Sequence, residues 1–410
     1  MSQVTYEQLR EAVDGGAVAI RSSLTLASAG GPGSKVMPPT FGVADSAEHK
    51  YAVENRIVAG NQISKTVLLD SVASQANRME EALLDGWDLG ELDFPVALVD
   101  FADCDDLEDL GRLTSLEAPH RLADAIFRDC LLEGTLFRLS TVGRAVSNAT
   151  PKNAAALLHY SPHALLFGMW DSTGPKGGLG SKFQRAIVSE IVGFDAELGA
   201  AVGSRIDPFD IRKGATGILP SSNADEVWTF DKGSARKGKE MRPSEINHGN
   251  IMPSIDGRAG GVTISEARQT VVLSLPALRK LRFPQTVEGV ALDGSTRRDA
   301  ESAARTAVAA LGLAALTYQQ ELDFDLRSRC LLIPTHAPRV ELVGRNGETP
   351  QVIELNREAA QAILAQAASE AASFGLGFGE REIQLEPAPK LLELLRRSRR
   401  LATKEQPVAG

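Results

Sequence analysis

The sequence predicts an α+β fold with an antiparallel sheet, helices on one face of that sheet and long insertions. Strand-like and helix-like stretches are mixed along the 410 residues without the regular alternation of a parallel α/β fold. Two alanine-rich amphipathic stretches, at 299–320 and 355–373, predict long helices. The stretch 214–253 is rich in glycine, proline and basic residues and shows neither helical nor strand periodicity. It therefore predicts an insertion outside the core, either an extended arm or a disordered loop.

The remaining elements follow from local patterns in chain order. An N-terminal helix runs into a strand at 17–26, and a glycine- and proline-rich loop follows at 30–40. Short apolar runs predict strands at 66–70, 95–101 and 164–170, alternation predicts a strand or hairpin edge at 260–275, and a glycine cluster precedes a strand at 382–385. Helical spacing predicts helices at 71–84, 119–130 and 390–401, the last of which is strongly basic.

One six-residue pattern, Gly-Gly-x-Gly-Ser-Lys, occurs twice, at 30–35 and at 177–182. Glycines let the backbone bend and let a ligand come close, and exposed N–H groups beside a lysine suit a phosphate oxygen. Two such loops indicate more than one phosphate, as on a nucleic-acid backbone. The alternative is two tight turns of similar composition. The candidate RNA-binding residues in and beside these loops are Gly31, Gly33, Lys35, Lys176, Gly178, Gly180 and Lys182.

A second repeated pattern places an amide three residues after a serine and an arginine directly after the amide. It begins at Ser74 and again at Ser181, and helical spacing predicts that each serine lies at the start of a helix, with Lys182, Arg185 and Ser189 on the polar face of the second. A helix N-terminus with an adjacent arginine favours an anion. Capping and solvation alone are the alternative interpretation. The candidates added here are Ser74, Gln75, Asn77, Arg78, Gln184 and Arg185.

Charge and composition narrow the function classes. The net charge of −9 argues against a protein that coats DNA non-specifically, although a local basic groove remains possible. An acidic run at 100–109 is expected to be a solvated loop, and basic clusters lie at 205–212, 236–242 and 396–400. Three widely spaced cysteines predict reduced thiols in a cytoplasm. Neither a secretory signal nor an apolar run long enough to span a membrane is expected.

Known catalytic patterns do not match the sequence. In both glycine loops a serine separates the last glycine from the lysine, which breaks the P-loop pattern. The nucleophile-elbow, zinc-protease and zinc-deaminase patterns also do not match. Asp171 is the best isolated carboxylate, and capping of a turn is its simpler role. We therefore expect no catalytic residues, no metal site and no cofactor.

Three segments of the chain resemble a known family. They are residues 30–40, residues 68–82 with the motif Leu-Asp-Ser-x-x-Ser-Gln-Ala-Asn-Arg, and residues 177–193. Together they are similar to the repeat-associated (RAMP) backbone subunit of type I-G CRISPR surveillance complexes, formerly type I-U, which forms the seventh Cas family. The resemblance runs from about residue 24 to residue 194. The glycine cluster at 375–379 is also similar to the glycine-rich loop near the end of RAMP proteins.

This resemblance implies a single domain over 1–410, with an RRM-like (ferredoxin-like) palm and a finger-like insertion at 27–66. Composition places a thumb-like basic arm at 214–256. The resemblance implies that several copies bind CRISPR RNA through its phosphates in a Cascade complex and leave the bases free to pair with a target DNA strand in antiviral defence. The implied partners are further copies of the chain, a large subunit and a Cas five/six-type subunit. Cleavage of DNA belongs to a separate helicase-nuclease.

Two other functions remain open from the residues. One is an enzyme that uses the glycine loops to bind a nucleotide or a sugar phosphate. The other is a RAMP subunit that cleaves RNA with a divalent metal through an acidic loop residue. Comparing the affinity for guide-length RNA with that for ATP or GTP distinguishes an RNA-binding subunit from the enzyme. An assay for RNA cleavage with a divalent metal distinguishes it from the RAMP nuclease.

Overall fold

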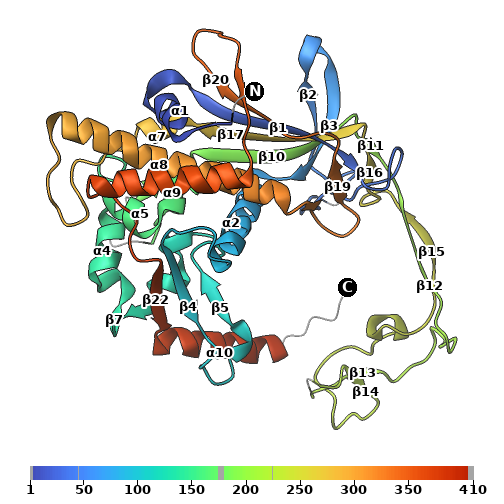
Figure 1. Ribbon diagram of the computed structural model, residues 1–410. Helices are drawn as coiled ribbons and strands as arrows, with labels where there is room; N and C mark the ends of the chain where they lie inside the picture. Colours follow the sequence, from blue (N-terminus) through green and yellow to red (C-terminus); the bar gives the residue numbers. More distant parts are fainter. Residues whose placement is uncertain (1–2, 45, 174–179, 224, 405–410) are drawn as a thin grey trace.

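The computed structural model describes residues 3–44, 46–173, 180–223 and 225–404. It confirms the mixed α+β class, with antiparallel sheets and helices packed beside them (Figure 1). Within the described residues, nine strands form the main sheet. They are β1 (Ala19–Ser28), β2 (Val53–Ile57), β3 (Ile63–Asp70), β10 (Ile187–Phe194), β17 (Glu266–Ser274), β18 (Phe324–Asp325), β19 (Leu331–Pro334), β20 (Arg339–Val343) and β21 (Gln351–Ile353).

The centre of the main sheet consists of three long antiparallel strands in the order β1-β17-β10. β3 and β2 continue the sheet beyond β10, and β19, β18 and the β20–β21 hairpin extend it on the side of β1. Side chains of β1 alternate between buried and partly exposed, with Ile20, Leu24 and Leu26 inward. This period of two fixes which face of the sheet meets the helices.

Helices cover one face of the main sheet (Figure 1). The helix α2 (Val72–Asp88) packs against β10 and against α8 (Gly294–Glu321), and α9 (Arg357–Ser373) packs on α8. Helix α8 is buried on nearly all sides, and its many alanines allow its neighbours to approach closely. The other helices are α1 (Tyr6–Glu11), α3 (Ala125–Arg128), α4 (Thr141–Asn148), α5 (Ala155–Tyr160), α6 (Pro162–Phe167), α7 (Leu275–Arg279) and α10 (Pro389–Lys404). In the described part of the chain, none of the helices combines the length and the apolar character needed to cross a membrane.

A second sheet lies on the far side of the helices from the main sheet (Figure 1). Its strands, in spatial order, are β5 (Arg112–Thr114), β4 (Val96–Asp100), β22 (Glu382–Pro387), β6 (Cys130–Leu132) and β7 (Thr135–Leu136). The late strand β22 runs parallel to β4 and antiparallel to β6, so the end of the chain completes a sheet begun near residue 96. This pairing holds α10, which follows β22 directly.

The basic helix α10 binds the acidic run. Arg399 donates two hydrogen bonds to the Asp109 carboxylate at 2.7 and 2.8 Å, and Arg396 donates to the Asp105 carbonyl at 2.9 Å. The arginine holds the pKa of Asp109 below its usual range. The apolar side of α10 packs inward through Leu391. The acidic run is therefore exposed but not merely solvated, which corrects the expectation for this loop.

Reversing a charge at this contact is expected to loosen α10. Arg399→Asp and Asp109→Arg each place like charges together, so amide exchange of α10 should rise while that of α9 stays unchanged. The double variant restores opposite charges and should restore protection. Arg397→Ala is the control for loss of an arginine from α10, because Arg397 pairs with Glu393 of the same helix rather than with the acidic run. Unchanged exchange in both single variants would show that the contact does not hold the helix.

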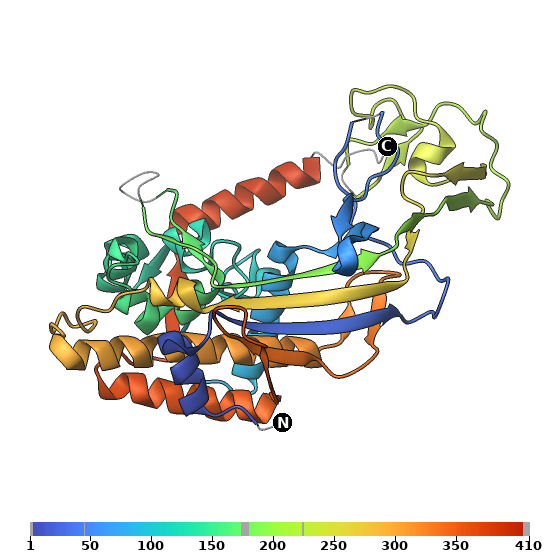
Figure 2. The same ribbon diagram turned by 90° about the horizontal axis from the view of Figure 1, so that it is seen from above.

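An arm extends from the main sheet, away from the helices, as Figure 2 shows from above. Its stem is the ribbon β12 (Ala201–Arg205) and β15 (Ile251–Asp256), and its tip holds the pair β13 (Leu219–Pro220) and β14 (Trp228–Thr229). A small cluster with the buried side chains of Ile218 and Met241 orders the tip. The large apolar side chains of the stem and its end are strongly exposed: Val202, Ile206, Phe209, Met252 and Ile255. The arm includes the segment 214–256, where composition predicts an extended basic arm, and begins earlier, at β12.

Three expected elements have a different structure. The predicted strand at 164–170 is α6 followed by β8 (Met169–Trp170), because Pro162 takes the first position of α6, where its missing N–H costs nothing. The predicted helix at 119–130 is two short turns, the 3₁₀ turn η4 (Arg121–Ala123) and α3. The stretch 260–275 contains β17, which is central in the sheet rather than an edge.

The prediction of a helix that begins at Ser181 is wrong. The chain forms β9 (Lys182–Phe183), which pairs with β8, and then β10. Ile187 and Ile191 are buried as expected, but as alternate residues of a strand. Ser189 was expected on the polar face with Lys182, yet it points inward between them and is 4 % exposed. Four β-branched residues in β10 favour this strand.

Candidate RNA-binding surface

The first glycine loop joins β1 to the segment before β2 and consists of tight turns. Gly31 and Gly33 both have positive φ, at 81° and 79°, so these two positions favour glycine. The N–H groups of Gly31 and Ser34 donate to carbonyls at the loop's own turns, which leaves them committed within the protein. Lys35 is exposed, and its Nζ donates to the Ala200 carbonyl at 2.8 Å. An ammonium carries three donors, so Lys35 keeps capacity for a phosphate.

The second glycine loop is described from Gly180 onward, whereas the candidates Lys176 and Gly178 lie outside the described residues. Ser181 is buried and donates to the Ala149 carbonyl at 2.9 Å. Lys182 is exposed on β9, and its Nζ lies 5.1 Å from the ring centroid of Trp170, its cross-strand neighbour. Gln184 is also exposed and accepts a hydrogen bond from Lys280 at 3.4 Å.

Arg185 is half-buried in the link between β9 and β10. Its side-chain stem lies against Gly168, where a Cβ would come within 3.1 Å of Arg185 Cγ. Gly168 also has a φ of 85°, so both the backbone conformation and the close approach of Arg185 favour glycine at this position. Burial lowers the pKa of Arg185, the charge of Arg121 adds to that effect, and the Glu80 carboxylate opposes it. Among the described residues its guanidinium has no hydrogen-bond acceptor.

A buried ion pair holds the backbone on which Arg185 packs. Arg121 donates to both oxygens of Glu80, at 2.6 and 2.8 Å, and to the Gly168 carbonyl at 2.9 Å. Both side chains are almost fully buried. Burial raises the pKa of Glu80 to about 7, against the opposing pull of Arg121. The pair therefore fixes the backbone at Gly168 against which Arg185 rests.

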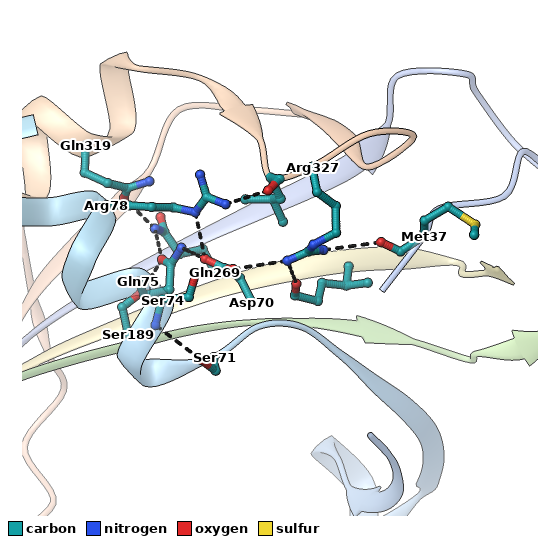
Figure 3. A network of polar contacts seen from close by, with 12 residues as sticks. Met37, Asp70, Ser71, Ser74, Gln75, Arg78, Ser189, Gln269, Gln319 and Arg327 are labelled. Atoms are coloured by element: carbon teal, nitrogen blue, oxygen red, sulfur yellow. Dashed lines mark hydrogen bonds and ion pairs between the residues drawn. The ribbon is translucent and has the colours of Figure 1, made fainter. Parts of the chain in front are cut away.

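A second polar network lies at the N-terminal end of α2 (Figure 3). Arg78 donates to Asp70 Oδ2 at 3.0 Å and to the Leu326 carbonyl at 2.7 Å. Arg327 donates to the other oxygen of Asp70 and to the Met37 carbonyl, both at 3.3 Å. Two guanidinium groups thus share one carboxylate that is 1 % exposed. Two of the Arg78 nitrogens are committed to Asp70, at the end of β3, and to the β18–β19 loop, whereas Arg327 is the residue that binds the glycine-loop segment.

The four candidates on α2 differ in exposure. Gln75 is fully buried, and its amide is used inside the protein by Asp70, Ser189 and Gln269 at 2.6 to 2.9 Å (Figure 3). Ser74 and Arg78 are half-buried, and Asn77 is exposed. The helix begins earlier than the serine pattern indicated: Ser71 is the cap and accepts from the Ser74 N–H at 3.2 Å.

The two glycine loops lie at opposite ends of β10. The second loop ends at Lys182, and β10 begins shortly after it at Ile187, whereas Lys35 contacts Ala200, which lies beyond the other end of the strand. Seven steps of a strand span roughly 23 Å. The register pairs Asp70 with Ile191, so α2 begins near the middle of this line. The structure therefore arranges the candidates in a row rather than in one pocket.

Sequence reasoning missed Arg121, Glu80 and Arg327, which hold the candidates in place. The pair Glu80–Arg121 joins residues 41 apart and Arg327–Asp70 joins residues 257 apart, so no local pattern reveals either. Asp171 was expected to cap a turn, but it is buried and paired with Arg138 at 2.5 Å. Among the described residues, no group of three or more His, Cys, Asp or Glu is placed to hold a metal ion.

Comparison with known proteins shows that one part of the chain is similar to a known family. Residues 20–198 match the model of the family described as CRISPR-associated protein GSU0053. The matched segment runs from β1 to β11 (Glu197–Leu198) and includes both glycine loops, α2 and β10. None of the curated proteins matches the chain. Over residues 20–198 the chain is thus similar to a CRISPR-associated family, and this similarity supports a CRISPR-associated role.

Proposed function

We propose that the chain is a non-catalytic subunit that binds CRISPR RNA through its phosphates in a type I-G Cascade complex, with the main sheet as an RRM-like palm. The observation that carries this proposal is Arg185. Its guanidinium is partly desolvated and its side-chain stem rests against Gly168, yet none of the described residues accepts a hydrogen bond from it. A guanidinium in this state favours a phosphate, which it can bind with two parallel hydrogen bonds. Lys182 adds an exposed ammonium close by.

The row of candidates along β10 supports an extended ligand over a mononucleotide. Phosphate sites at Arg185 and Lys35, roughly a strand length apart, suit a single RNA strand that runs beside β10. Asn77 is exposed on α2, the helix that begins beside the middle of β10. The Gly31 and Ser34 N–H groups are used within their own turns, so a P-loop-like cradle around one phosphate has less support at that end.

Equilibrium binding tests this function. The purified chain should bind unstructured RNA of guide length much more tightly than ATP or GTP, and its affinity should fall steeply with salt. Nucleic acid that purifies with the protein should raise the ratio of absorbance at 260 nm to that at 280 nm. Preference for a nucleotide would support the enzyme alternative, and cleavage of RNA that needs a divalent metal would support a RAMP nuclease.

Binding is expected to be independent of the guide sequence. The chain has 5 % aromatic residues and no aromatic RNP motif, and the candidates are backbone-directed groups. Two unstructured guides of equal length and unrelated spacers should therefore bind within about threefold, or roughly 0.65 kcal/mol. Competition between labelled and unlabelled guides measures this ratio. A tenfold preference would contradict phosphate-directed recognition.

Assembly along the guide is expected to depend on the arm. A chain of net charge −9 repels its own copies, so neighbouring subunits need specific contacts. Exposed apolar side chains on the stem, including Val202 and Ile255, provide an unpartnered surface, and Lys237 and Lys239 at the tip are exposed cations. We infer that the arm crosses the guide and contacts the next copy.

Native mass spectrometry with guides of increasing length tests the arm. The number of bound copies should rise in steps with guide length in the intact chain. A variant that lacks residues 221–250, joined by a short glycine-serine linker, should bind fewer copies per guide. Shortening the β20–β21 turn, at 344–350, is the matched control. An unchanged copy number and affinity without residues 221–250 would show that this tip of the arm is only a surface loop.

A further inference from the structure

Trp170 is an exposed aromatic side chain beside the cations of the second glycine loop. It is 48 % exposed, whereas Trp87 is 2 % exposed and Trp228 packs edge-on against Phe230. Its cross-strand neighbour is Lys182, so both side chains project from the same face of the β8–β9 pair. Leaving an indole in water forgoes the free energy of burying it, and an exposed tryptophan next to cations is thus a feature to explain.

The backbone on both sides of Trp170 is fixed. Met169 before it is buried in the core, and Asp171 after it is buried and paired with Arg138 at 2.5 Å. The Asp171 N–H donates to the Ser181 carbonyl at 2.8 Å, which ties β8 to the residue before Lys182. The exposed indole is therefore held in a defined place rather than at the end of a free loop.

Arg185 lies on the same short structure. Its stem packs on Gly168, two residues before Trp170, and Lys182 Nζ lies 5.1 Å from the centre of the indole ring. An exposed aromatic ring with one cation over its face and a second cation on the adjoining link between β9 and β10 matches how proteins hold single-stranded nucleic acid: the cations take phosphates and the ring takes the face of an unpaired base.

We infer that Trp170 stacks on an unpaired base of the RNA whose phosphates Lys182 and Arg185 contact. This inference rests on the proposed function and deepens it, because it adds a base contact to a site otherwise directed at the backbone. Stacking is tolerant of sequence, since every base has a π-face. It is therefore compatible with equal binding of unrelated guides.

Abasic RNA separates stacking from phosphate contact. We compare an unstructured RNA of guide length with an oligonucleotide of the same length made entirely of abasic ribose phosphates. The wild-type chain should bind the complete RNA about tenfold more tightly than the abasic one. Trp170→Ala should lose this difference and leave binding of the abasic strand unchanged, and Trp170→Phe should retain part of it. Leu394→Ala, which truncates an exposed apolar side chain on α10, is the control.

Tryptophan fluorescence gives an independent readout. Complete RNA should quench the wild-type emission, abasic RNA should quench it less, and Trp170→Phe should lose that difference. Arg185→Ala should weaken binding of both strands by the same factor. If neither strand binds the wild type, the proposed function fails. If both strands bind with equal affinity, RNA binding stands and the stacking inference is overturned.

Discussion

Replacing Arg121 by methionine is expected to lower the free energy of unfolding by about 3–5 kcal/mol, because it leaves a carboxylate buried without its partner. Arg121 and Glu80 are almost fully buried and joined by two short hydrogen bonds. Arg121 also donates to the Gly168 carbonyl. Loss of this side chain should therefore weaken the support of Arg185 as well as the fold, and RNA affinity should fall together with stability.

A double variant separates the cost of the unpaired charge from that of lost packing. Glu80→Leu with Arg121→Met removes both charges, so it should recover most of the stability lost in Arg121→Met. Urea denaturation followed by circular dichroism measures the three proteins. If the double variant is as unstable as the single one, the loss comes from packing or from the Gly168 contact rather than from the buried charge.

The same pair has a defined pH dependence. Burial raises the pKa of Glu80 from 4.5 to about 7, so the folded chain binds a proton more tightly than the unfolded chain does. The stability that comes from the raised pKa of Glu80 is fully present below about pH 4.5 and is lost as the pH rises through about 7. Glu80→Gln should flatten the change in urea midpoint over this interval.

Local patterns in the sequence predict the long helices of this fold better than the segments whose structure depends on remote partners. The amphipathic stretches at 299–320 and 355–373 correspond to α8, which begins earlier at Gly294, and to α9, because helical periodicity over many turns has few competing explanations. The segment 183–192 satisfies helical and strand spacing at once. Pairing of β10 with β17 and β3 decides its structure, and those partners are remote in the sequence.

The candidate site residues also divide into those that local patterns predict correctly and those whose burial depends on remote contacts. The duplicated glycine motif identifies Lys35 and Lys182, and the serine–amide–arginine pattern identifies Arg185; these side chains are exposed or half-buried in the structure. The second pattern also includes Gln75, whose amide is hydrogen-bonded inside the protein. A motif shows which residues occur together, whereas burial depends on contacts such as Gln75–Gln269, which join residues 194 apart.

Arg185→Ala is expected to weaken RNA binding about tenfold for every guide sequence and to lower the slope of log affinity against log salt by about 0.7 to 1. The side chain is charged, partly desolvated and without an acceptor among the described residues, so it contributes little to folding and much to an arriving phosphate. Removing it abolishes one phosphate contact without touching any base contact. Filter binding at several salt concentrations measures both quantities.

Two matched variants show whether the loss is specific to this position. Arg345→Ala removes the same charge from the β20–β21 hairpin and should change neither the affinity nor the slope. Arg185→Lys keeps the charge but loses the paired donors of the guanidinium, so it should retain the salt slope and recover only part of the affinity. An unchanged slope in Arg185→Ala, with the fold intact, would remove Arg185 from the RNA-binding surface and with it the observation on which the proposed function depends most.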